Sequence, residues 1–90
     1  MTCFIVSYDT ETNNDEKILG VIRSYTPHAQ ICKNTWAVVT SEEATDIRDK
    51  LKEILTPTDR IFVIRSGEEA GWANVLCEKS WLHQYLMNEY

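Results

Sequence analysis

The sequence predicts an α+β fold in which strands and helices follow one another in the order β-α-β-β-α-β. Two observations carry this prediction. Short runs rich in β-branched and aromatic residues alternate with segments whose apolar residues recur at helical spacing. Turn-forming or helix-capping residues stand between neighbouring segments. The 90 residues show no composition shift or linker, so we expect one domain, 1–90, with a core at 3–66 and a C-terminal extension at 67–90.

The first strand and the first helix are both marked by their apolar pattern. Residues 3–8 form an almost continuously apolar run that stops at Asp9, which is typical of a buried strand. Apolar residues at helical spacing predict a helix over about 14–25. Asn13 and Glu16 stand three residues apart at its start, which resembles a capping signal.

A hairpin and a second helix follow. Two β-rich runs, 28–32 and 35–40, are separated by two residues, which is the length of a tight hairpin turn. Thr40 and Glu43 have the spacing of a capping box, with Thr40 as the cap. Apolar residues then trace a helical stripe to about residue 55, and the charged residues between them are read as a solvated helix face.

The last part of the chain is predicted to add one core strand and an extension. Residues 60–65 form another apolar strand, 72–76 suggest a short fifth strand, and Ser80 can cap a final helix. The whole order is that of the ferredoxin-like plait, with an antiparallel sheet and both helices on one face. The first and third strands should be central neighbours. The additional strand and helix would form a C-terminal β-α extension.

Both faces of the predicted sheet are apolar, because neighbouring residues of each strand point to opposite faces and are apolar alike. Two helices cover one face, so the second face needs another cover. We expect a symmetric homodimer packed through sheets and tails. The alternative is that the tail of the same chain, with Trp72, Trp81 and Tyr85, folds back over the face.

Charge and composition argue against several classes of protein. Fourteen acidic and nine basic residues give a net charge of −5, which opposes tight nonspecific binding to RNA or DNA. No run approaches the roughly 18 apolar residues of a membrane span, and no signal-peptide pattern is present, so we expect no membrane association. Three cysteines without metal-binding spacing are typical of a reduced, cytoplasmic protein.

Asp9 is the residue on which a chemical hypothesis depends. A carboxylate at the end of a buried strand is a hard oxygen ligand of the kind that Mg²⁺ prefers, although an aspartate there can also simply begin a turn. Tyr8 could stack on a base or contact a phosphate, whereas a tyrosine in a central strand is more often a core residue. An RNA-recognition motif is disfavoured, because residues 35–40 lack its glycine and its basic lead residue.

Three motifs together resemble a known family. They are Ser7-Tyr8-Asp9 at the end of the first strand, the run 34–40 and the run 59–64. Over residues 3–66 the chain resembles the small CRISPR-associated proteins that form the second universal subunit of the adaptation machinery, and most closely their SinR-like branch. VapD-type toxin ribonucleases share the architecture. The resemblance implies a homodimer in which two copies of Asp9 face each other, bind one Mg²⁺ or Mn²⁺ ion and cut RNA or DNA.

The chain also departs from this family. The loop after Asp9 is acidic where the family commonly has a basic one, and the family's third-strand residues are matched loosely, by Lys33 and Thr35. With Tyr8, these two are weak candidates for contacts to nucleic acid. Two functional hypotheses therefore stand: a metal-dependent endonuclease that acts as a homodimer, and a noncatalytic dimeric adaptor that retains the nuclease-like fold. The acidic charge favours the adaptor.

Overall fold

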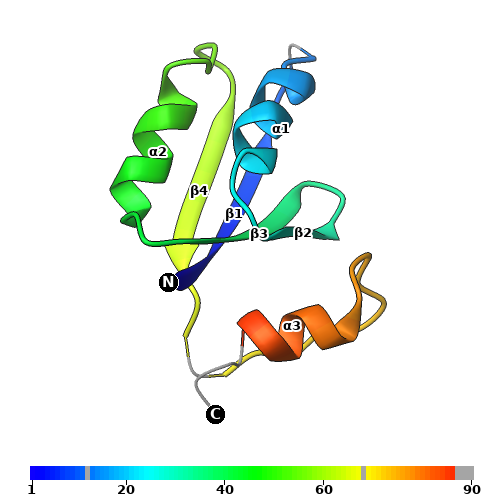
Figure 1. The fold of residues 1–90 in the computed structure, drawn as a ribbon. Helices are drawn as coiled ribbons and strands as arrows, with labels where there is room; N and C mark the ends of the chain where they lie inside the picture. The colour runs from blue at the N-terminus through cyan, green and yellow to red at the C-terminus, as the bar shows by residue number, and fades with distance from the viewer. Residues whose placement is uncertain (12, 68, 87–90) are drawn as a thin grey trace.

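The α+β architecture is confirmed by a computed structural model, which describes residues 1–11, 13–67 and 69–86 (Figure 1). The described residues form four strands and three helices. In chain order these are β1 (Thr2–Asp9), α1 (Asp15–Arg23), β2 (His28–Cys32), β3 (Thr35–Thr40), α2 (Ala44–Lys52), β4 (Arg60–Arg65) and α3 (Lys79–Tyr85). Across this described part, every helix is too short or too polar to span a membrane.

The four strands form one antiparallel sheet in the order β2-β3-β1-β4. As expected, the first and third strands are central neighbours, and β2 and β3 form a hairpin. The amide of Tyr8 donates to the carbonyl oxygen of Asn34 at 3.1 Å, so the hairpin turn lies beside the end of β1. At the other end, the amide of Ser66 donates to the carbonyl oxygen of Cys3 at 2.9 Å and extends the β1–β4 ladder.

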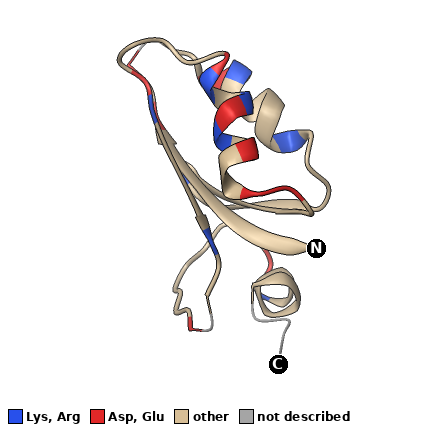
Figure 2. Ribbon diagram, turned by 90° about the vertical axis from the view of Figure 1, so that its left-hand side faces the viewer, with Lys and Arg blue, Asp and Glu red and all other residues tan. Residues whose placement is uncertain are grey.

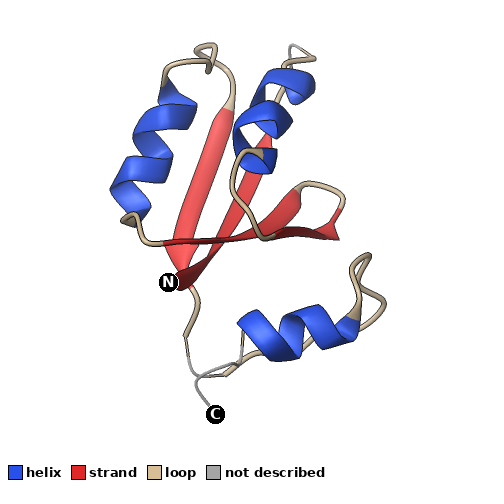
Figure 3. Ribbon diagram, in the orientation of Figure 1, coloured by secondary structure: helices blue, strands red, loops and turns tan. Residues whose placement is uncertain are grey.

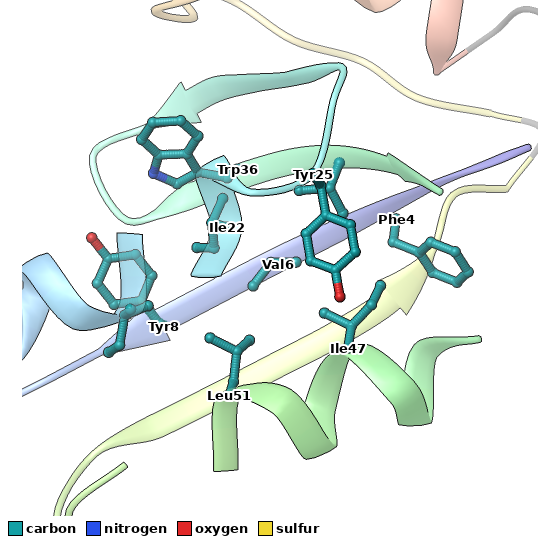
Figure 4. Packing of buried hydrophobic residues seen from close by; sticks show 10 residues of the cluster. Phe4, Val6, Tyr8, Ile22, Tyr25, Trp36, Ile47 and Leu51 are labelled. Atoms are coloured by element: carbon teal, nitrogen blue, oxygen red, sulfur yellow. The ribbon is translucent and has the colours of Figure 1, made fainter. Parts of the chain in front are cut away.

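Helices α1 and α2 lie together on one face of the sheet (Figure 2). Alternate residues of β1 and β3 point into this layer, and the apolar stripes of the two helices meet them. In Figure 4, Ile47 and Leu51 of α2 point toward Val6 of β1. The buried residues of this cluster are Phe4, Val6, Tyr8, Ile18, Ile22, Tyr25, Trp36, Val38, Ile47 and Leu51. This is the core that the strand alternation and helical periodicity predict.

The second face is covered in part by the chain's own tail. Helix α3 lies across β2 and β3 from α1, and its Leu82 is 1% exposed (Figure 1). The buried residues of this second cluster are Cys3, Ala37, Val39, Leu82 and Leu86. The predicted tail residues Trp72, Trp81 and Tyr85 pack against it. The tail is therefore the cover for the part of the face on β1 and β3, which is the alternative that the sequence left open, and the homodimer stays a prediction.

The tail leaves the β4 part of the second face open. On this face Phe62 stands opposite Ser7 and Ile64 stands opposite Ile5. The side chain of Phe62 is 61% exposed and that of Ile64 is 49% exposed. We call these two residues the β4 strip. An exposed aromatic and an exposed β-branched residue side by side on a strand are unusual unless something covers them.

The predicted fifth strand does not form. Residues 72–76 are loop, so the extension contributes a helix without a strand (Figure 3). The segment crosses the sheet face, where the amide of Leu76 donates to the carbonyl oxygen of Ile31 at 2.9 Å. Trp72 and Val75 pack into the second cluster. Their β-forming side chains pack on the sheet face, and the segment does not form a ladder with the edge strand β2. Residues 87–90, part of the predicted extension, lie outside the described residues.

The helices begin at other residues than the sequence suggests. Thr40 is the last residue of β3, paired with Thr2, and α2 starts four residues later with Glu43 as its N-cap. The amide of Glu43 donates to Asp46 Oδ2 at 2.9 Å, which takes the place of the predicted Thr40–Glu43 box. Thr40 does not cap the helix, because its backbone is paired with β1 and completes the β1–β3 ladder.

Helices α1 and α3 also begin at other residues than the sequence predicts. Asn14, rather than Asn13, caps α1, and its side chain makes no capping bond. Glu78, rather than Ser80, precedes the first residue of α3. Helix α1 ends at Arg23, two residues before the predicted end. Helix ends depend on what the flanking side chains bind elsewhere, so local signals place them to within a few residues.

Candidate functional site

Asp9 ends β1 beside Arg60, its partner residue on β4. The Asp9 Oδ1 and Arg60 Nη1 atoms are 3.3 Å apart, and the same nitrogen lies 4.0 Å from Oε2 of Glu11. The Asp9 side chain is 58% exposed. An ion pair this exposed contributes about 0–1 kcal/mol, so the carboxylate stays accessible to solutes. The acidic loop expected after Asp9 is thus partly neutralised by a cation from β4.

A shallow hollow of about 310 Å³ adjoins this ion pair. Its lining residues are Ser7, Tyr8, Asp9, Arg60, Ile61 and Phe62. Ser7 lies on the same sheet face as Asp9, and its Oγ is 3.3 Å from Oγ1 of Thr35 across the β1–β3 ladder. The structure therefore brings two sequence candidates, Asp9 and Thr35, to the same end and face of the sheet.

The other two candidates lie differently. Tyr8 points to the opposite face, where it is 6% exposed and belongs to the core under α1 and α2. Burial raises the pKa of its phenol, and the negative charge of Asp15 raises it further. Lys33 is exposed in the β2–β3 turn, where its carbonyl oxygen accepts a 3.1 Å bond from Nε2 of Gln30. Tyr8 is thus positioned as a core residue, and Lys33 as a surface cation near the end of β1.

Asp59 is the organising residue of this end of the sheet, although its sequence position predicts no such role. It is buried, and its carboxylate accepts hydrogen bonds from three residues. The Thr10 hydroxyl donates at 2.5 Å, Nδ2 of Asn14 donates at 2.9 Å, and the amide of Thr56 donates at 2.9 Å. Asn14 Nδ2 also donates to the carbonyl oxygen of Ile54 at 2.7 Å. The network ties the loop after β1 and the start of α1 to the loop before β4.

This network fixes the two strand ends that carry the ion pair. Thr10 directly follows Asp9, and Asp59 directly precedes Arg60. The hydrogen bond between Thr10 and Asp59 therefore holds the backbone next to each member of the Asp9–Arg60 ion pair. The Thr10 hydroxyl bond and the Thr56 amide bond hold the pKa of the Asp59 carboxyl far below its usual range. The sequence signal for this role was weak, since Thr10 and Asn14 lie 40 or more positions from the groups of Ile54 and Asp59 that they bind.

The lowered pKa of Asp59 predicts acid sensitivity. A carboxyl whose pKa falls on folding contributes stability above its unfolded pKa of about 3.9, and loses it as the pH falls toward the lower folded-state pKa. We expect the urea midpoint of the wild type to fall as the pH drops from about 5 to 3. Asp59→Asn should have a lower midpoint at neutral pH and a flatter pH profile.

The matched control is Asp49→Asn, because Asp49 is an exposed carboxylate paired with Arg48 on α2. This variant should keep the wild-type midpoint at neutral pH and the wild-type pH profile. An Asp59→Asn variant as stable and as acid-sensitive as the control would contradict the role assigned to the network.

Metal binding at Asp9 would need ligands from outside the chain. Within residues 1–11, 13–67 and 69–86, no group of three or more histidine, cysteine, aspartate or glutamate side chains could hold a metal ion. Near Asp9 the second carboxylate is that of Glu11, and Arg60 contacts both. Because Arg60 already contacts both carboxylates, a metal ion would have to compete with its guanidinium for them. One chain thus fits a Mg²⁺ or Mn²⁺ site poorly. Comparison with protein-family models and with curated proteins finds no match.

Proposed function

We propose that this chain is a noncatalytic, homodimeric interaction module built on a ferredoxin-like plait. The observation that carries the proposal is the β4 strip, Phe62 and Ile64, which the tail and the helices leave open. Apolar side chains exposed together on a strand favour association with another surface. The strand order β2-β3-β1-β4, with every pair antiparallel, supports the plait.

The electrostatics of the Asp9 end support a noncatalytic role. Asp9 and Glu11 both share Arg60, so the cation that could meet a phosphate is already paired twice. The chain as a whole carries a net charge of −5, which repels a polyanionic backbone. The arrangement is that of a structural ion pair at a strand end, held in place by the Asp59 network.

A metal-dependent endonuclease, as the family resemblance implies, is the second candidate. Two observations favour it: the Asp9 carboxylate is exposed, and the hollow beside it is open to solutes. In this candidate the ion would be shared between Asp9 residues of two copies, with waters and substrate phosphate as the remaining ligands. It requires a dimer in which the two β1 ends meet.

A cleavage assay separates the two candidates. Labelled single-stranded RNA and duplex DNA are incubated with the wild type and with Asp9→Asn, with Mn²⁺ and with chelator. We expect no cleavage that depends on Asp9, since Arg60 competes with a metal ion for the carboxylates and the acidic charge of the chain opposes a polyanionic substrate. Equal cleavage by both proteins would indicate a contaminating nuclease. Mn²⁺-dependent cleavage that Asp9→Asn reduces tenfold or more would replace the adaptor by the endonuclease.

A further inference from the structure

Strand β4 is an edge strand with an unusually apolar sequence. Among the described residues it pairs with β1 on one side and with no strand on the other. Its four central residues, Ile61–Ile64, are all apolar, and arginines stand at its two ends. Proteins commonly protect such edges with charges, prolines or bulges, because an open apolar edge accepts another strand. In the interior of β4 none of these protections is present.

The direction of the backbone groups of β4 follows from the β1–β4 ladder. The amide of Ser66 donates to Cys3 at 2.9 Å, and this pair continues the register in which Arg65 stands opposite Phe4. In an antiparallel ladder every second residue bonds to the neighbouring strand. The backbone groups of Phe62 and Ile64 therefore face β1. Those of the intervening residues, Ile61, Val63 and Arg65, point to the open edge.

We propose that a second copy of the chain adds to this edge, with β4 antiparallel to β4 about a two-fold axis at Val63. The sheet of one copy then continues into the sheet of the other. The proposal rests on the homodimer proposed above and specifies its interface. In this register Val63 pairs with Val63, and Ile61 pairs with Arg65 of the second copy. Ile61, Val63 and Arg65, whose backbone groups point to the open edge, thus all exchange backbone hydrogen bonds with the same set of residues in the second copy.

The same register brings the β4 strips of the two copies into side-by-side contact. A two-fold axis perpendicular to the sheet sets residues of the same face opposite one another, so Phe62 meets Ile64 of the second copy, and Ile64 meets Phe62. No arginine stands directly opposite another arginine. A register centred on Phe62 would instead set Arg60 against Ile64 and Arg65 against Asp59, which lies before β4 and is bound in its own network. The Val63 register is therefore favoured.

The helix side of the edge leaves room for the added strand. A hollow of about 240 Å³ lies between α2 and β4 beside this edge. Its lining residues are Ala44, Thr45, Arg48, Ile61, Phe62 and Val63. The tail helix α3 packs on the side of β2 and β3, away from β4 (Figure 1). Neither the α1/α2 layer nor the tail helix α3 therefore blocks a second chain from reaching the open edge of β4.

The proposed dimer separates the two copies of Asp9. Asp9 stands opposite Arg60, three residues from the centre of β4, so the two copies lie on opposite sides of the axis. At about 3.3 Å per residue they are roughly 20 Å apart along the strands. In this arrangement the two carboxylates cannot share one ion, so this dimer and the endonuclease dimer exclude each other.

Amide hydrogen exchange followed by nuclear magnetic resonance tests the edge pairing directly. The full chain is compared at about 20 µM and about 1 mM, concentrations that bracket the affinity of a small interface. We expect exchange of the Ile61, Val63 and Arg65 amides to slow about four- to sixfold at the higher concentration, because exchange occurs from the monomer and the monomer fraction falls by that factor. The Phe62 and Ile64 amides, already bonded to β1, are protected at both. Arg65→Pro removes an outward amide at an exposed position and should abolish the concentration dependence.

Each outcome has one meaning. A dimer whose Ile61, Val63 and Arg65 amides exchange as fast as in the monomer overturns the edge pairing and leaves the homodimer standing. A chain that stays monomeric at about 1 mM overturns both the edge pairing and the proposed homodimer. Protection of the outward amides in the wild type that Arg65→Pro removes supports the edge dimer. Persistence of that protection in Arg65→Pro, with the variant dimeric, would contradict the Val63 register.

Discussion

Replacing Leu82 by alanine is expected to lower the free energy of unfolding by about 3 kcal/mol. Leu82 is 1% exposed and packs in the second cluster with Cys3, Ala37 and Val39, so its loss leaves a cavity between α3 and the sheet. Urea denaturation followed by far-ultraviolet circular dichroism measures the change. In the same series, tryptophan fluorescence reports on Trp72 and Trp81, which pack against this cluster.

Leu76→Ala is the matched control for this substitution. Leu76 belongs to the same tail but is 62% exposed, so its truncation should change the free energy of unfolding by less than about 0.5 kcal/mol. Equal effects of the two substitutions would mean that α3 does not dock on the sheet in solution. The second face would then be open from β2 to β4, and its exposed apolar surface would not be confined to the β4 strip.

The second large effect concerns association. Phe62→Lys is expected to weaken dimerisation roughly 100-fold, about 2.7 kcal/mol, because the two-fold axis places the new charge in the interface twice. Leu76→Lys is the control, since Leu76 and Phe62 are equally exposed, at 62% and 61%, and Leu76 lies in the tail. Size-exclusion chromatography with light scattering, run as a dilution series, gives the two affinities.

The fold of the Phe62→Lys variant should be unaffected, because its side chain already lies mostly in solvent. Its circular dichroism spectrum and urea midpoint at low concentration are the check. A Leu76→Lys variant that dissociates as strongly as Phe62→Lys would move the interface from β4 to the tail. Dimerisation unchanged in both variants would remove β4 from the interface.

The strands and helices were predictable because their patterns are local. The alternation in 60–65 and the helical stripe after Thr40 each depend on a short stretch of neighbouring residues. The tail was predicted less well. Residues 72–76 have strand-forming side chains, yet their environment is a sheet face already lined with apolar residues, and packing there outweighs local propensity.

The site was less predictable than the fold, because its contacts join distant parts of the chain. The strand end at Asp9 was visible in the sequence, but its partner Arg60 is 51 positions away. The Asp59 network likewise joins residues 10 and 14 to residues 56 and 59. No local spacing rule links such positions. The exposure of Phe62 depends on where the tail stops, which the three-dimensional packing decides.

Sedimentation equilibrium of the wild-type chain tests whether the β4 strip makes this chain a homodimeric module. At about 1 mM and about 0.15 M salt, which screens the repulsion between two chains of net charge −5, we expect close to twice the chain mass of 10.4 kDa. A single species at the chain mass up to about 1 mM would contradict the homodimer and leave the β4 strip without the partner proposed for it.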